Sequence, residues 1–160
     1  MICSSRNSKF EIFRMALISA ADQQRLRDAF AEMTRSVRLV FFTQTLGCDT
    51  CAEAKQILDE LPPLSDRITI EEVNFVLDAD KVKQYGIDRV PSIALVGHDE
   101  SGDHESRIRF AGAPTGYEFS SLIHAILLVG GRPSSLSDAQ RQQLASLERP
   151  VVLQVFSTPT

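Results

Sequence analysis

The sequence predicts an α/β domain in which a central mixed sheet is flanked by helices. Residues 39–42 form a continuous apolar run of strand length, which is typical of a strand buried on both faces. Residues 52–61 follow closely, are rich in helix formers and stop at two prolines. Residues 117–129 place apolar side chains at helical spacing and end at two glycines. Strands and helices therefore alternate along the chain.

The other elements are predicted from the same kinds of local signal. Ser19, followed three residues later by Asp22, is typical of a helix N-terminus, and apolar residues recur at helical steps from Leu26 onward. After the first strand and its helix, the predicted order is a strand, a short helix closed by a glycine, two strands joined by a polar loop, and the last helix. Their ranges are residues 68–75, 80–85, 92–96, 107–110 and 117–129, with the loop at 97–106.

Composition and charge exclude several classes of protein. The chain has 160 residues, of which 43% are hydrophobic and 24% charged, as in a soluble globular protein with one buried core. A net charge of −4 without a run of basic residues argues against nucleic acid as a partner. No apolar stretch is long enough to cross a membrane or to form a signal peptide, so we expect a cytoplasmic protein.

Three cysteines are too few for a disulfide scaffold, so the close pair Cys48 and Cys51 indicates chemistry or metal binding, and Cys3 is expected to take no part. The pair lies where the predicted strand meets the helix. The free N–H groups and partial positive charge of a helix N-terminus favour a thiolate at Cys48. We predict that Cys48 attacks a disulfide, that Cys51 resolves the mixed disulfide, and that no cofactor or metal is needed.

Two neighbouring residues and two histidines leave alternatives open. Asp49 opposes the helix effect, because a nearby carboxylate disfavours a second negative charge. Asp49 and Thr50 either tune the thiol or are simply good helix-start residues. Zinc and iron-sulfur sites use the same cysteine spacing, and His98 and His104 are the nearby candidate ligands for such a site.

Two segments together carry a family resemblance. Residues 47–51 (Gly-Cys-Asp-Thr-Cys) and 85–92 (Tyr-Gly-Ile-Asp-Arg-Val-Pro-Ser) resemble the redox motif and the cis-proline segment of the thioredoxin superfamily. Residues 109–119 narrow the resemblance to tandem, glutaredoxin-like protein disulfide oxidoreductases and to the N-terminal region of the alkyl hydroperoxide reductase flavoprotein subunit. The resemblance covers residues 19–160. It implies a thioredoxin-like fold in which Pro91 is cis and Val90 offers its backbone to a substrate strand.

The chain departs from that family pattern in three places. The motif lacks the tryptophan and proline of thioredoxin, the strand before it carries no carboxylate, and Glu72 stands where thioredoxins often have lysine. These departures concern the groups that handle protons during resolution. Retention of both cysteines also separates the chain from the first unit of the flavoprotein, which resembles it but has generally lost the pair.

The chain is expected to divide into four parts. Residues 1–14 are predicted to be a disordered or non-native extension before a start at Met15, residues 15–131 the redox domain, and residues 132–136 a linker. Residues 137–160 repeat the opening helix and strand, as an incomplete second unit truncated before its own CxxC motif. Its apolar segment is expected to dock on the first domain or to join two chains as a homodimer.

The resemblance and the motif together favour an enzyme, a protein disulfide oxidoreductase that acts as a reductase. Protein disulfides are the expected substrates, a peroxiredoxin among them, and an unidentified reductase or glutathione is the expected electron donor. Val90, Pro91, Asp49 and Thr50 are the expected substrate-binding residues. The alternatives are a non-catalytic thioredoxin-like module that binds a partner around Pro91, and a metal-binding domain.

Overall fold

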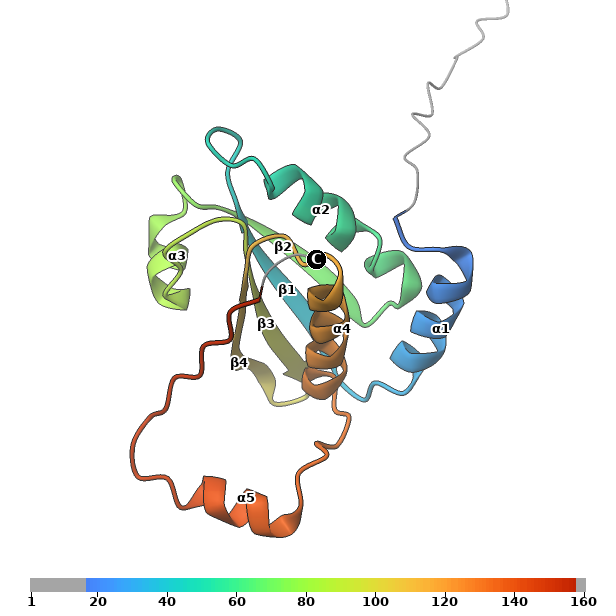
Figure 1. The fold of residues 1–160 in the computed structure, drawn as a ribbon, viewed down its shortest axis with the longest axis vertical. Helices are drawn as coiled ribbons and strands as arrows, with labels where there is room; N and C mark the ends of the chain where they lie inside the picture. Colours follow the sequence, from blue (N-terminus) through green and yellow to red (C-terminus); the bar gives the residue numbers. More distant parts are fainter. Residues whose placement is uncertain (1–16, 158–160) are drawn as a thin grey trace, which may run out of the picture.

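The computed structural model describes residues 17–157 and shows a four-stranded sheet with helices on both faces (Figure 1). The strand order is β2-β1-β3-β4; β1 is parallel to β2, and the other neighbours are antiparallel. This mixed sheet confirms the predicted fold class. The strands are β1 (Ser36–Thr43), β2 (Ile68–Asn74), β3 (Ser92–Asp99) and β4 (Gly102–Ala111); the helices are α1 (Ala20–Ala31), α2 (Cys51–Asp59), α3 (Ala79–Tyr85), α4 (Tyr117–Val129) and α5 (Asp138–Ala145), with a short 3-10 helix, η1, at Pro62–Leu64.

Strand β1 is central and buried on both faces, as its apolar run predicts. Leu39 and Phe41 belong to the larger core, which they share with residues of α1, α2 and α4. Val40 and Phe42 point the other way, into a smaller core beside α3, because successive strand residues face opposite sides of a sheet. All four side chains are fully buried, and burial of each contributes roughly 1.5–3 kcal/mol.

The predicted capping of the first helix is confirmed. The Ser19 hydroxyl accepts a hydrogen bond from the backbone N–H of Asp22 at 3.1 Å. The Glu60 carboxylate, just after α2, accepts the backbone N–H groups of Leu17 and Ile18 at 2.6 and 2.9 Å. The start of α1 is therefore tied to the end of α2. The proposed start at Met15 and the role of Cys3 lie outside the described residues.

The prediction of a polar loop at residues 97–106 is wrong, because most of these residues are in strands. Strand β3 continues to Asp99 and β4 begins at Gly102, so only two residues turn the hairpin. Strand β4 lies at the edge of the sheet, where charged side chains face solvent and no alternating apolar pattern is required. The ladder is also irregular between Ala94 and Val96, opposite the part of β4 where Arg107 has a positive φ of 60°.

The C-terminal segment matches its prediction only in part. Helix α5 follows Ser137, whose side chain forms a capping box with Gln140. The strand expected near residues 151–156 is not formed, because no neighbouring backbone pairs with this segment in the described part of the chain. Its apolar side chains are 65–87% exposed, so they do not dock on the first domain as one alternative predicted; they are Val151, Val152, Leu153, Val155 and Phe156.

Among residues 17–157, no helix has the length and apolar character that crossing a bilayer requires.

Candidate active site

Cys48 and Cys51 lie at the junction of β1 and α2. β1 ends at Thr43, and α2 begins at Cys51 itself. The two cysteines form a disulfide, with their Cα atoms 5.5 Å apart. Cys48 is partly exposed, whereas Cys51 is only 5% exposed. One cysteine of the pair is therefore partly accessible from outside and the other is shielded.

The residues between the cysteines are both exposed. Thr50 occupies the N-cap position of α2, but its side chain makes no capping hydrogen bond. Asp49 precedes it without entering the helix. The positive φ of Gly47, 72°, turns the chain into the motif, and the Gln44 side chain donates to the Gly47 carbonyl at 3.3 Å. The loop therefore presents Asp49 and Thr50 to solvent beside the disulfide.

The Val90–Pro91 segment lies at the same end of the sheet as the cysteines. Phe42 pairs with Ser92 in the antiparallel β1–β3 ladder, so the chain leaving β1 and the chain entering β3 are neighbours. The Val90–Pro91 peptide bond is cis. The Pro91 carbonyl accepts the Gly112 N–H at 2.8 Å, and the Ser92 hydroxyl donates to the Arg89 carbonyl at 2.8 Å.

A groove of about 470 Å³ lies beside the disulfide and contains charged residues that sequence reasoning missed as site residues. Both cysteines line it, together with Lys55, Glu72 and Asp78. Lys55 makes an ion pair with Glu72. The hydrogen bond that Lys55 donates to the Glu72 carboxylate is the largest cause of the raised pKa of Lys55. The four-residue spacing of Lys55 from Cys51 is the sequence signal that could have found it.

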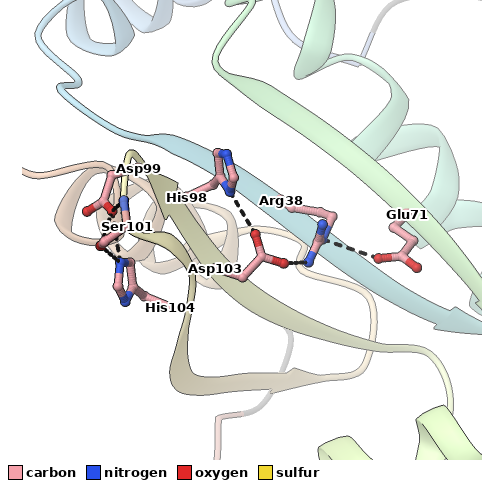
Figure 2. A network of polar contacts seen from close by, with 7 residues as sticks. All are labelled: Arg38, Glu71, His98, Asp99, Ser101, Asp103 and His104. Carbon is pink, nitrogen blue, oxygen red and sulfur yellow. Dashed lines mark hydrogen bonds and ion pairs between the residues drawn. The ribbon is translucent and has the colours of Figure 1, made fainter.

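The two histidines considered as metal ligands lie far from the cysteines. His98 pairs with Ser36 at the start of β1, at the opposite end of the sheet from the Phe42–Ser92 pair. Figure 2 shows each histidine with a different aspartate: His98 Nδ1 is 2.8 Å from Asp103, and His104 Nε2 is 2.9 Å from Asp99. Within residues 17–157, no group of three or more histidine, cysteine or acidic side chains could hold a metal ion.

Asp103 also links this hairpin to the first two strands. Its carboxylate contacts Arg38 on β1, and the Arg38 Nε is 3.2 Å from the Glu71 carboxylate on β2 (Figure 2). Hydrogen bonds from His98 and Arg38 lower the pKa of Asp103, and hydrogen bonds from Ser101 and His104 lower that of Asp99. This network therefore stabilises the end of the sheet opposite the disulfide.

Comparison with known proteins finds a relative among the alkyl hydroperoxide reductases. No family model matches the chain. It is 31% identical over 145 residues to the alkyl hydroperoxide reductase AhpF of Staphylococcus epidermidis, a match that covers 90% of this chain and 25% of that protein. The chain thus spans about a quarter of the length of this curated relative.

Two solved structures share the fold at moderate sequence identity. The N-terminal domain of the alkyl hydroperoxide reductase AhpF from Enterococcus faecalis has a TM-score of 0.72 and 27% identity, covering 82% of this chain and 61% of that one. A protein disulfide oxidoreductase from Aeropyrum pernix has a TM-score of 0.69 and 25% identity, covering 81% and 55% respectively. Together with the disulfide at the start of α2, these similarities support a thiol–disulfide redox function. The chain has a thioredoxin-like fold and resembles the N-terminal region of the alkyl hydroperoxide reductase AhpF.

Proposed function

We propose that this chain is a thiol–disulfide oxidoreductase that reduces protein disulfides through Cys48 and Cys51. The observation that carries the proposal is the disulfide between a partly exposed and a buried cysteine at the start of α2. An exposed sulfur can reach a disulfide of another protein, whereas a shielded sulfur beside it is suited to attack its neighbour. Cys48 is therefore the attacking cysteine and Cys51 the resolving one.

The proposed reaction has two exchange steps. The Cys48 thiolate attacks one sulfur of the substrate disulfide; that bond breaks, and the departing substrate thiolate takes a proton from solvent. Cys51 then loses its proton and attacks the Cys48 sulfur, which releases the second substrate thiolate. The substrate gains two electrons, and the dithiol ends as the Cys48–Cys51 disulfide. A second dithiol, or two glutathione thiols, returns the pair to its reduced form.

The end of the sheet that carries the disulfide is suited to a protein substrate. Three large apolar side chains at this end are exposed: Leu46 at 84% and Leu77 at 80%, both on loops, and Tyr117 at 83%, the first residue of α4. Large apolar side chains that are exposed favour contact with another protein. We assign the backbone contact with the substrate to Val90 and Pro91.

Asp49 and Thr50 are the proposed contacts on the other side of the sulfurs, because both are exposed beside Cys48. The family resemblance favours a peroxiredoxin among the protein substrates, and glutathione or a disulfide reductase as the electron donor, in the cytoplasm. In this proposal residues 15–131 form the redox domain and residues 132–136 the linker. Residues 137–160 open a second unit, through which two chains form a homodimer.

The proposal is tested by reduction of insulin disulfides with dithiothreitol as the electron donor. The unsubstituted protein should accelerate insulin reduction over dithiothreitol alone, and Cys48→Ser should bring the rate back to that background. A protein that binds partners but gives only the background rate would contradict the enzyme and favour the non-catalytic binding module.

A further inference from the structure

The groove beside the disulfide contains an ion pair that the exchange reaction described above does not use. Lys55 and Glu72 line this groove together with both cysteines. Lys55 follows Cys51 by four residues on α2, and side chains at that spacing share one face of a helix. Glu72 comes from β2, where it pairs with Phe41, on the sheet face that α2 covers. Helix and strand therefore place this pair next to the resolving cysteine.

The resolving cysteine needs help to ionise. Cys51 is 5% exposed, and burial disfavours the charged form of a thiol. Resolution nevertheless requires the thiolate, because the thiolate and not the thiol is the nucleophile. Among the described residues that line the groove, Lys55 alone carries a positive charge. An ammonium group on the same helix face offsets part of the cost of a thiolate at Cys51.

Lys55 is itself held by carboxylates. It contacts Glu72, and its Nζ is 3.1 Å from Asp59. The Glu72 hydrogen bond keeps the pKa of Lys55 raised, so its side chain is an ammonium at neutral pH. Asp78 is the other acidic residue among the described residues that line the groove, and its carboxylate accepts the backbone N–H of Asn74 at 2.7 Å. Glu72 and Asp59 thus weaken the field that Lys55 exerts on the sulfurs, without removing it.

We propose that Lys55 promotes ionisation of Cys51 in the reduced protein, and that Glu72 limits this effect by holding the Lys55 ammonium. The proposal rests on the proposed function, since it concerns the resolution step. In that step the Cys51 thiol gives its proton to solvent, and its thiolate forms beside Lys55. The thiolate then bonds to the Cys48 sulfur, the bond from Cys48 to the substrate breaks, and the substrate leaves as a thiolate that takes a proton from solvent.

The two members of the pair should have opposite effects on resolution. Lys55→Gln removes the cation from the groove, so Cys51 should ionise at higher pH. Glu72→Gln leaves the Lys55 ammonium with one carboxylate fewer, so Cys51 should ionise at lower pH. If the ion pair were purely structural, its loss would instead shift resolution in the same direction in both variants. Lys55→Arg keeps the charge and should restore the behaviour of the unsubstituted protein.

The experiment follows the reduced full-length protein with 5,5′-dithiobis(2-nitrobenzoic acid) in a stopped-flow instrument, in a Cys3→Ser background. Attack by Cys48 releases one coloured thiolate, and resolution by Cys51 releases the second. At pH 7, Lys55→Gln should slow the second phase by about threefold to fivefold and Glu72→Gln should accelerate it by about twofold, as expected for partly exposed charges. The pH midpoint of the second phase should move up in the first variant and down in the second.

The matched control is Lys81→Gln. Lys81 makes an ion pair with Glu71, the neighbour of Glu72 on β2, but on the opposite face of the sheet. The Lys81→Gln variant should leave the rate of the second phase unchanged. Shifts in the same direction for Lys55→Gln and Glu72→Gln, or no shift in either, would overturn this inference while the first phase still reported exchange. If Lys55→Gln does not fold, a Glu72→Gln variant without acceleration would suffice to overturn it. Absence of both phases in the unsubstituted protein would instead defeat the proposed function.

Discussion

Phe42 pairs with Ser92 across the β1–β3 ladder, and this pairing brings together the two segments that form the candidate active site. The chain runs from Phe42 into the loop that carries Cys48, and Pro91 immediately precedes Ser92. Residues distant in sequence are thus joined at one end of the sheet by its antiparallel register. The first predictions concern the chemistry at that end.

The two cysteines should have different roles when each is replaced. Cys48→Ser should abolish disulfide exchange, because the accessible nucleophile is lost. Cys51→Ser should instead accumulate mixed disulfides with protein substrates, because attack survives and resolution does not. Non-reducing electrophoresis and mass spectrometry of the trapped species would show this difference. Trapping by Cys48→Ser and not by Cys51→Ser would reverse the assignment.

Asp49 should make Cys48 a weaker nucleophile at neutral pH. Its carboxylate is next to the sulfur in sequence and opposes the N-terminal field of α2. Asp49→Asn should therefore increase the rate of Cys48 alkylation by iodoacetamide at pH 7 by about twofold to threefold. Asp28→Asn, on the exposed surface of α1, should leave the rate unchanged. Equal rates for the Asp49 variant and the unsubstituted protein would show that Asp49 has no tuning role.

Helix α4 should contribute strongly to stability through its buried face. Leu122 is fully buried in the larger core, so Leu122→Ala should lower the free energy of unfolding by about 2–5 kcal/mol. Leu144 on α5 is 54% exposed, and Leu144→Ala should change it by less than about 0.5 kcal/mol. Urea unfolding followed by circular dichroism measures both values. Similar losses in the two variants would contradict the packing described for α4.

The hairpin network in Figure 2 should make stability fall in acid. The pKa of Asp103 is lowered in the folded protein, first by the hydrogen bond from His98 and then by Arg38. Stability from this carboxylate is therefore fully present above its unfolded value of about 3.9 and is lost as pH falls through the lower folded value. Asp103→Asn should reduce the dependence of the unfolding free energy on pH below about pH 4. The control Asp66→Asn, on an exposed turn, should keep the pH dependence of the unsubstituted protein. An unchanged slope in the Asp103 variant would show that the network does not contribute.

The exposed apolar segment near the C-terminus should associate with a second chain. Leu153 and Phe156 are 85% and 87% exposed, and an apolar extended segment without partners favours pairing with another backbone. Light scattering should therefore report a dimer for the unsubstituted protein and a monomer for Leu153→Asp combined with Phe156→Asp. A monomer at every concentration of the unsubstituted protein would contradict association through this segment.

The sequence predicted those elements whose burial gives a clear pattern. Strand β1 was predictable because a strand that is buried on both faces has a continuous run of apolar residues, and Leu39–Phe42 is such a run. Helix α4 was predictable because its stripe of buried residues has helical spacing. Strand β4 was only partly recognised, because an edge strand exposes most of its side chains and its charged residues resemble a loop.

The candidate site was predictable only as far as it is local in sequence. The CxxC spacing and its position between a strand and a helix were enough to identify the two cysteines as the reactive pair. The contact between Lys55 and Glu72 depends on which residue of β2 faces α2, and so on the β1–β2 register, which local patterns do not determine. The prediction of a strand after α5 was wrong for a related reason, because an apolar run becomes a strand only when another backbone pairs with it.

The central claim is that Cys48 and Cys51 form a reversible redox couple that reduces protein disulfides. Its most direct test is the reduction potential of this couple, measured by equilibrating the full chain in glutathione buffers and quantifying the disulfide. We predict a potential of about −270 mV, the value of a reducing thioredoxin. A potential of about −120 mV, as in a strong oxidant, or a disulfide that does not respond to the buffer, would contradict the account.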